Sequence, residues 1–395
     1  MMRAILAPAG VLSDINRPEV DVAVIGGGPA GTAAALTLLK YSSLTVAVVE
    51  RSAYSGWRVG ETLPPGVPPL LQYLDAWESF AAQGHLPAYG TSAAWGSQEI
   101  VSRDFLFTGR GQGWHLDRAR FDRRLAQLVS ERGGFLFTES IVTSETRDEE
   151  GRWRLFVRHR NAPSHTELIA RFVIDASGRG ATFARRQGAL RNVHDRLMGV
   201  VGIYEFETGS PRDTFTLVES CPVGWWYSAR LPDARMVVAF MSDTDIIRRY
   251  RMLQSSTWPD LINSSRHLRQ RLAGGVLKSP PVLCPAFSQV LNTVAGDGWV
   301  AAGEAAIGFD PLSSMGIGYA LTSGIHAARA VHCALIAGAE QMSHYTTSVK
   351  QHFANHLDRK WQYYLIERRW PDWPFWFRRH QQPKTGRASG ASGSL

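Results

Sequence analysis

The sequence of 395 residues is poor in cysteine and lysine, and it lacks a long apolar run. Its three cysteines, Cys221, Cys284 and Cys333, are far apart and form no C-x-x-C pair. This argues against a disulfide framework and a zinc site, and it suits the reducing cytoplasm. No stretch of about 18 apolar residues is available to span a membrane, and residues 1–20 make a poor signal peptide. We therefore expect a cytoplasmic globular protein without a membrane partner.

Only five lysines occur, so arginine supplies nearly all the positive charge, and the formal net charge is +8. The arginines are spread along the chain, which argues against a nucleic-acid partner and leaves an anionic substrate or an acidic protein open. His352 and His356 are four residues apart, but Phe353 stands where a zinc protease has glutamate. We predict no metal site there, only a solvated helix face.

Residues 20–52 have the order of a β-α-β unit that binds a dinucleotide. An apolar strand leads into Gly26-Gly27-Gly28-Pro29-Ala30-Gly31, an Ala/Leu-rich helix follows, and a second strand ends at Glu50, beside Arg51. Glycine at the first position permits a tight turn, at the second it lets backbone approach a pyrophosphate, and at the third it lets helix and strand pack closely. Glu50 is placed to accept hydrogen bonds from ribose hydroxyls.

Two later segments extend this pattern towards a flavin. Segment 168–188 is an expected strand that ends at Asp175. Segment 296–331 is a strand, then Gly303 and Glu304, then a loop of small residues, Ser314-Met315-Gly316-Ile317-Gly318, that begins a helix. A carboxylate after a strand can bind a ribityl hydroxyl, and a helix N-terminus can offer N–H groups to the electron-rich edge of the flavin ring. We therefore predict FAD as the cofactor.

These segments together resemble the FAD-dependent monooxygenases of the p-hydroxybenzoate hydroxylase fold, and within them the flavin-dependent halogenase-like branch. The stretches WRVGETLPP (57–65), GWHLDRARFDRRL (113–125) and DPLSSMGIG (310–318) are similar to that branch. The resemblance implies an α/β fold with a Rossmann-like FAD-binding domain, an inserted mixed-sheet substrate domain and a C-terminal helical segment. One departure is Glu304, where the family usually has Asp, so the flavin is expected to sit differently or bind more weakly.

The resemblance also implies a discontinuous arrangement of domains. We expect an FAD-binding domain from residues 18–80, 110–190 and 285–340, and a substrate domain from 81–109 and 191–284. Residues 341–380 should form the C-terminal helical segment, and 1–17 and 381–395 should be flexible.

The family's roles can be carried onto matching positions of this chain. Gly26, Gly28, Gly31 and Glu50 should hold the ADP half, Glu304 the ribityl chain, and residues 314–318 the ring. Arg58 and Arg118 should approach the pyrophosphate or the flavin, because an arginine fork suits a phosphate; ion pairing at the surface is the alternative.

The halogenase-like branch contains enzymes that catalyse different reactions, and two sequence features of the halogenases are missing here. Tryptophan-type halogenases use a lysine between the first β-α-β unit and the HLDRARFD region, and residues 51–130 contain none. Their W-x-W-x-I-P motif is reduced to YSARLP at 227–232. A monooxygenase needs mainly a dry pocket that protects a C4a-hydroperoxyflavin.

Such a pocket wall could come from Trp225, Trp226 and Tyr227, for which a role as core aromatics of a sheet is the alternative. His115 and Asp310 are the polar groups expected nearest the ring. Either could transfer protons, since histidine titrates near neutrality and a buried aspartate can be raised in pKa. Structural roles for both stay open.

The stretch TSAAWGS (91–97) and the aromatic tail at 363–380 resemble LodB, GoxB and QhpG-type flavoproteins, which modify tryptophan in a partner protein. This implies hydroxylation of an aromatic group, an indole or tryptophan that is free or borne by a peptide or protein. It also implies electrons from a separate flavin reductase, with direct use of NAD(P)H as the alternative. The tail would then dock the protein substrate, or its tryptophans simply pack on the second domain. A halogenase, a two-electron flavin oxidase or reductase, and a basic binding protein with structural flavin remain alternatives.

Overall fold

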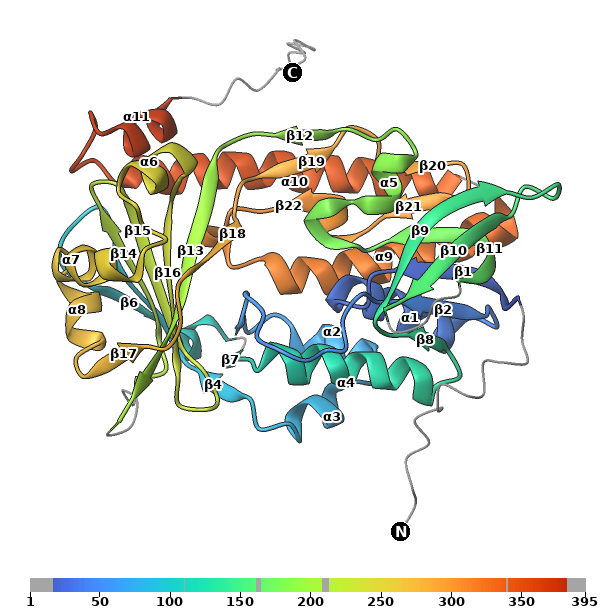
Figure 1. Ribbon diagram of the computed structural model, residues 1–395, viewed down its shortest axis with the longest axis horizontal. Helices are drawn as coiled ribbons and strands as arrows, with labels where there is room; N and C mark the ends of the chain where they lie inside the picture. The colour runs from blue at the N-terminus through green and yellow to red at the C-terminus, as the bar shows by residue number, and fades with distance from the viewer. Residues whose placement is uncertain (1–16, 110, 161–164, 208–212, 339, 382–395) are drawn as a thin grey trace, which may run out of the picture.

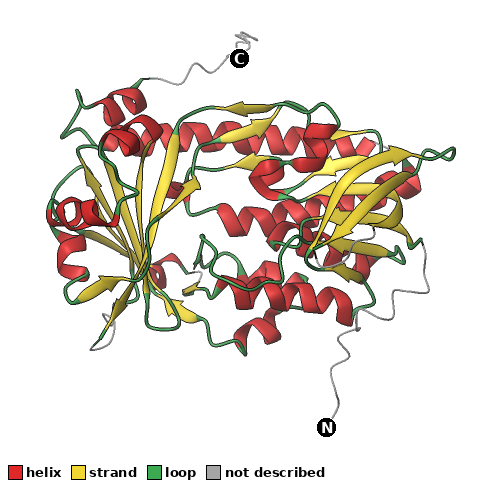
Figure 2. Ribbon diagram, viewed as in Figure 1, coloured by secondary structure: helices red, strands yellow, loops and turns green. Residues whose placement is uncertain are grey.

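The computed structural model describes residues 17–109, 111–160, 165–207, 213–338 and 340–381. Nearly all of the two expected flexible ends, 1–16 and 382–395, lies outside these ranges. Figure 1 shows two large sheets side by side, joined by helices that run along the molecule. Figure 2 shows strands and helices interleaved around the first sheet, whereas the second is mostly strand. The predicted α/β fold is thus confirmed. No described helix is long and apolar enough to cross a membrane.

The first sheet contains the predicted dinucleotide unit. Its strands follow the order β20-β21-β11-β1-β2-β8, and β10 and β9 continue from β11 as an antiparallel flap. The strands are β1 (Glu19–Ile25), β2 (Val46–Val49), β8 (Phe135–Phe137), β9 (Ser140–Arg147), β10 (Trp153–His159), β11 (His165–Asp175), β20 (Ala295–Gly296) and β21 (Trp299–Ala301).

The parallel core of this sheet brings four strand ends to one edge. Ile25 of β1 lies beside Val49 of β2 on one side and beside Asp175 of β11 on the other, and Asp175 in turn lies beside Ala301 of β21. Because ligands of open α/β sheets bind beyond the carboxyl ends of the strands, this edge is the expected cofactor site.

Four helices pack on the first sheet: α1 (Pro29–Tyr41), α4 (Arg118–Glu131), α5 (Thr182–Arg186) and α9 (Gly316–Ala337). The short helices α2 (Pro68–Tyr73) and α3 (Trp77–Ala81) pack on each other, and α3 packs on α4. Helices α1 and α9 pack so closely that a Cβ on Gly324 would lie 2.1 Å from the carbonyl oxygen of Ala30. This contact holds the N-terminal end of α1 against the middle of α9.

The second sheet is the mixed sheet that the sequence predicts. Its order is β17-β13-β16-β15-β14-β5-β6, with β18 also on β13; β14 and β5 are parallel and the other pairs antiparallel. The strands are β5 (Gly90–Ala94), β6 (Val101–Asp104), β13 (Leu197–Phe206), β14 (Thr216–Cys221), β15 (Gly224–Arg230), β16 (Met236–Asp243), β17 (Gly275–Leu277) and β18 (Val282–Pro285). Figure 1 places α7 (Trp258–Asn263) and α8 (His267–Arg271) on the side of this sheet that is remote from the first sheet, and α6 (Thr244–Arg249) at its top.

Two small sheets lie between the large ones. One has the order β3-β7-β4, with β3 (Thr62–Leu63), β4 (Leu86–Ala88) and β7 (Gly113–His115); the other has the order β12-β19-β22, with β12 (Arg191–Val193), β19 (Gln289–Leu291) and β22 (Ile307–Gly308). The segment 81–109 therefore divides its strands, because β4 joins a small sheet and β5 and β6 join the second large sheet.

The C-terminal residues form a strap across both parts. Helix α10 (Glu340–Ile366) runs along the top of Figure 1 from the first sheet to the second, and α11 (Pro374–His380) follows it. Trp376 of α11 is fully buried, and its indole N–H donates to the carbonyl of Cys221 at 2.9 Å. Trp373, by contrast, is 41% exposed. The tail thus packs partly on the second sheet and partly faces outwards.

Candidate functional site

The glycine-rich turn after β1 is built as the sequence predicts. Gly26 has a φ of +106°, which favours glycine, and a Cβ there would lie 2.3 Å from the carbonyl oxygen of Ala176. A Cβ on Gly31 would lie 1.8 Å from the carbonyl oxygen of Gly26. Gly28 differs, because a Cβ there would meet no atom of the described residues within 4 Å. The turn is therefore packed tightly against neighbouring backbone at Gly26 and Gly31, and it is open at Gly28.

Helix α1 begins at this opening. Pro29 is its first residue and Ala30 follows, while the preceding Gly28 has no side chain that could cap the helix. The first N–H groups of such a helix lack intrahelical partners, and together with the helix dipole they attract an anion. An uncapped helix end beside open space at Gly28 fits the pyrophosphate of FAD.

Glu50 ends β2 directly beside this turn. It is 5% exposed, and its carboxylate accepts hydrogen bonds from the backbone N–H groups of Gly27 at 2.8 Å and Ser52 at 3.0 Å. Arg58 adds an ion pair at 3.3 Å. The neighbouring Arg51 is exposed. Glu50 therefore holds the turn in shape at the place predicted for the ribose.

Arg58 and Arg118 meet at one buried carboxylate. Each lies 3.0 Å from Asp122, whose side chain is fully buried. Arg118 also donates to the carbonyls of Val59 at 2.8 Å and Gly60 at 2.9 Å. This arrangement differs from ion pairing at the surface, the alternative left open by the sequence. Arg118 fixes the loop that carries Arg58, and Arg58 reaches Glu50.

Asp175 lies on the predicted edge, but its carboxylate is committed to the local turn. It is fully buried and accepts hydrogen bonds from the N–H groups of Ser177 at 3.0 Å, Phe183 at 3.0 Å and Ala184 at 2.8 Å. These bonds fix the start of α5. In this structure the side chain organises the edge and presents no oxygen to open space.

Glu304 follows Gly303, which has a φ of +61° and packs against Ala30 of α1. The Glu304 side chain is 42% exposed, and it accepts a hydrogen bond of 2.9 Å from Nε of Arg179. Arg179 also donates to the carbonyls of Phe287 at 2.6 Å and Phe309 at 2.9 Å. Sequence reasoning did not single out Arg179; its place directly after Gly178, beyond the end of β11, was the available signal.

The small-residue loop lies between Asp310 and α9. Ser314 has a φ of +50°, Met315 precedes the helix, and Gly316 faces open space among the described residues. Gly318, two residues into the helix after Ile317, contacts Val67 of the 56–67 segment, since a Cβ there would lie 3.5 Å from the Val67 side chain. The uncapped N-terminus of this 22-residue helix fits the electron-rich edge of a flavin ring.

Asp310 connects this loop to α10 through hydrogen bonds. It is 1% exposed; it accepts hydrogen bonds from the N–H of Leu312 at 3.0 Å and the hydroxyl of Tyr364 at 3.0 Å. Burial raises the pKa of Asp310. The predicted solvated face around His356 is wrong, because His356 is 2% exposed and its Nε2 accepts the backbone N–H of Asp310 at 3.3 Å.

Three acids surround Arg118 from separate segments. Burial by itself would lower the pKa of Arg118, but the carboxylates of Asp122, Glu61 and Glu304 hold it above its ordinary value. The ADP end of the predicted site and the ribityl end at Glu304 therefore face a common region. A cavity of about 240 Å³ opens here between the two parts of the molecule; it is lined by Gly56, Trp57, Arg58, Leu116, Asp117, Arg118, Ala119, Leu231, Pro232, Asp233 and Arg235.

The pKa of His115 differs from the value near neutrality that we expect from the sequence. It is fully buried in β7, and its Nε2 lies 3.3 Å from the hydroxyl of Thr216. Burial lowers the pKa of His115 to about 4, with the positive charge of Arg271 acting in the same direction. The expectation that His115 titrates near neutrality is therefore wrong, and the imidazole is neutral at physiological pH.

The aromatic wall at 225–227 is divided by strand alternation. Trp225 and Tyr227 lie on one face, where the indole N–H of Trp225 donates to Tyr364 of α10 at 3.0 Å and the Tyr227 hydroxyl lies 2.6 Å from that of Thr62 of β3. Trp226 points to the opposite face and packs against Phe240 and Trp258. The prediction that Trp226 lines the pocket is thus corrected: it is a core residue beneath α7.

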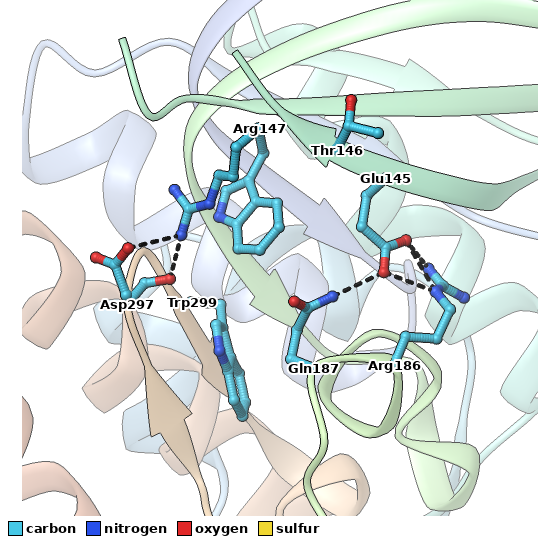
Figure 3. Close-up of a pocket in the computed structure, with 8 residues that line it drawn as sticks. Glu145, Thr146, Arg147, Arg186, Gln187, Asp297 and Trp299 are labelled. Atoms are coloured by element: carbon cyan, nitrogen blue, oxygen red, sulfur yellow. Dashed lines mark hydrogen bonds and ion pairs between the residues drawn. The ribbon is translucent and has the colours of Figure 1, made fainter. Parts of the chain in front are cut away.

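A separate cleft of about 470 Å³ lies away from these residues (Figure 3). It is lined by Glu145, Thr146, Arg147, Trp153, Arg186, Gln187, Asp297 and Trp299. Its charges are paired within the cleft, since Arg147 binds Asp297 at 3.1 Å and Arg186 binds Glu145 at 2.8 Å. It contains none of the predicted cofactor residues.

Comparison with known proteins shows which family this chain belongs to. The family model of FAD dependent oxidoreductases matches residues 21–192. The LodB protein of Marinomonas mediterranea, which is named as an FAD-dependent oxidoreductase, is 32% identical over 362 residues that cover 91% of this chain and 96% of LodB. Tryptophan 2-halogenase of Chondromyces crocatus is 26% identical over 353 residues, which cover 86% of this chain and 66% of the halogenase.

Solved structures show the same fold. The flavin-dependent halogenase CmlS has a TM-score of 0.82 at 24% identity, and the alignment covers 93% of this chain and 68% of the CmlS chain. The peptidyl tryptophan dihydroxylase QhpG has a TM-score of 0.69 at 23% identity, covering 92% of this chain and 79% of its own. The chain therefore belongs to the FAD-dependent oxidoreductases, is an enzyme with FAD as its cofactor, and shares its fold with flavin-dependent halogenases.

Proposed function

We propose that this enzyme is a monooxygenase that hydroxylates the indole ring of a tryptophan carried by a peptide or protein. FAD, when bound, supplies the activation of dioxygen. The open turn at Gly28, Glu50 and Arg58 would hold the ADP half of FAD, Glu304 would hold the ribityl chain, and the N-terminus of α9 would face the ring. The face of the second sheet that carries Tyr227 supplies the opposite wall and excludes water.

The observation that carries this proposal is the placement of lysine. A halogenase of the tryptophan type uses a lysine between the first β-α-β unit and the HLDRARFD region, and residues 51–130 contain none. Lys40 of α1 pairs with Asp75 at 2.9 Å, Lys360 of α10 pairs with Asp195 at 2.7 Å, and Lys278 pairs with Glu205 at 2.7 Å. Lys350 is exposed on α10. Hydroxylation needs no such lysine.

Two comparisons support a peptide-borne substrate. LodB matches almost the whole length of this chain, and QhpG, which shares the fold, acts on peptidyl tryptophan. The described residues hold one dinucleotide turn, so we propose that a separate flavin reductase supplies the electrons.

The test is an assay of the FAD-loaded enzyme with a tryptophan-containing peptide, dioxygen, and electrons from a flavin reductase, with and without halide. We expect incorporation of oxygen from labelled dioxygen into the indole ring, independent of halide, by mass spectrometry. A product that contains halogen would overturn the proposal in favour of halogenation. Peroxide released without modified peptide or free indole would identify an oxidase instead.

A further inference from the structure

A chain of three polar side chains crosses from the flavin-binding part to the second sheet. The hydroxyl of Thr62 lies 2.6 Å from that of Tyr227. The Tyr227 hydroxyl donates to Oε1 of Glu61, and Oε2 of Glu61 accepts the backbone N–H of Gly60 at 3.1 Å. A phenol has one proton, and Tyr227 gives it to Glu61, so the Thr62 hydroxyl must be the donor to Tyr227. All the donors in this chain therefore point towards Glu61.

Glu61 is the buried end of this chain. It is 2% exposed, and no ion pair of the described residues includes it. Burial raises the pKa of Glu61, although the hydrogen bond from Tyr227 acts in the opposite direction. Tyr227 and Thr62 are partly exposed as whole residues and form the other end of the chain. A carboxyl group that forms no direct ion pair is costly to bury, and such groups are concentrated at functional sites.

The chain lies between the two ends of the predicted flavin site. Arg58, three residues before Glu61, reaches Glu50 at the ADP end. Val67, six residues after Glu61, contacts Gly318 at the start of α9. Tyr227 belongs to the sheet that forms the opposite wall. The hydroxyls of Thr62 and Tyr227 thus lie where the flavin-binding segment meets the second sheet.

We propose that Thr62, Tyr227 and Glu61 form a proton relay that carries the proton released by the aromatic substrate to the Glu61 carboxylate. The proposal rests on the hydroxylation proposed above, in which dioxygen supplies the oxygen atom. Once the ring carbon bears oxygen, its C–H bond breaks and the electron pair restores the aromatic ring. The proton passes to Thr62, Thr62 passes its own to Tyr227, and Tyr227 passes its own to Glu61. Both hydroxyls end unchanged, and the carboxylate becomes a carboxylic acid that later returns its proton to solvent.

Two cations face this relay from other elements. Arg118 of α4, which is paired with Asp122, lowers the pKa of Glu61 by its positive charge. Arg271 of α8, which is paired with Asp213 at 3.1 Å, lowers the pKa of Tyr227 in the same way. Both favour the ionised form of the group they face, so Glu61 can be a carboxylate before turnover and an acid after it.

The experiment compares Glu61→Gln, Tyr227→Phe and Thr62→Val with Tyr204→Phe, a matched control on the opposite face of the same sheet. For bound peptide we expect the hydroxylation rate to fall on the order of a hundredfold in the three relay variants, as when a general base is removed. Flavin reduction should not change. The Tyr204→Phe variant should behave as the wild type.

A second measurement is independent of activity: infrared spectra of the ligand-free protein across pH. We expect a protonated-carboxyl band that titrates above the ordinary range of glutamate, is absent in Glu61→Gln, and moves to higher pH in Tyr227→Phe because the carboxylate loses a donor. If the wild type hydroxylates no peptide, the proposed function fails, and this measurement still decides whether the chain holds a proton. Relay variants that lower thermal stability but keep the wild-type rate in the bound complex would overturn the relay, as would an infrared titration that Glu61→Gln leaves intact.

Discussion

The hydroxyl of Tyr364 donates a hydrogen bond of 3.0 Å to Oδ2 of Asp310, which ties α10 to the loop before α9. The same hydroxyl accepts the indole N–H of Trp225 at 3.0 Å. One phenol therefore links the C-terminal strap, the wall of the second sheet and the loop predicted to lie against the flavin. Because all three groups are buried, the link has no water to replace it.

Replacement of Tyr364 by Phe should loosen this loop. It removes the Tyr364 partner of Oδ2 of Asp310 and of the indole N–H of Trp225, and each buried unsatisfied group costs about 1–3 kcal/mol. We expect a lower free energy of unfolding in urea and weaker FAD binding by fluorescence titration. Tyr363→Phe is the matched control, since Tyr363 is 50% exposed. Equal effects of the two variants would contradict the link.

The glycines of the first turn should separate cofactor binding from folding. An added Cβ at Gly28 meets nothing of the described residues, and its φ of −76° suits alanine, so Gly28→Ala should leave the thermal midpoint of the apoprotein unchanged. It should nevertheless weaken FAD binding by about tenfold or more, since the new methyl group occupies the place of the pyrophosphate. Gly31→Ala should impair folding itself, because its Cβ would collide with Gly26. Unchanged FAD affinity in Gly28→Ala would place the pyrophosphate elsewhere.

Arg179 should act as a clamp for the segment that carries Glu304. Arg179→Gln removes donors from two carbonyls and from the Glu304 carboxylate, so we expect a loss of stability of about 1–3 kcal/mol and a weaker affinity for FAD. Arg185→Gln changes an exposed arginine of the same segment and should alter neither quantity. FAD affinity that stays at the wild-type value while stability falls would show that Glu304 needs no clamp.

The sequence predicts the first part of the site well because its signals are local. The strand period, the glycines and Glu50 belong to one short β-α-β unit, and each has a required backbone geometry. Strand alternation also indicates that Trp225 and Trp226 cannot face the same side. It does not tell which of them faces the flavin, since this depends on which face of the second sheet meets the first.

The rest of the site depends on contacts between distant segments. Glu61 and Tyr227 are 166 positions apart in the chain, and Arg179 and Glu304 are 125 apart. Composition and period carry no signal for such pairs. The charge state of His115 cannot be predicted from the sequence for the same reason, because His115 becomes buried only when β7 packs against the second sheet.

The buried histidines should make the protein sensitive to mild acid. Burial lowers the pKa of both His115 and His356 to about 4 in the folded protein, against about 6.5 in the unfolded chain. Between these values the unfolded chain binds protons that the folded protein does not, so stability rises with pH across this window and is lost on acidification. Each group contributes up to about 1.4 kcal/mol per pH unit within it.

The free energy of unfolding in urea, measured at several pH values between 7 and 5, tests this sign. We expect the wild type to lose stability as the pH falls, and His356→Gln to lose it less steeply, because Gln can still accept the N–H of Asp310 but cannot titrate. His165→Gln changes an exposed histidine at the start of β11 and should keep the wild-type slope. If His356→Gln follows the wild-type slope as well, His356 is protonated equally in both states, and its burial in the folded protein must be relieved by local opening around Asp310.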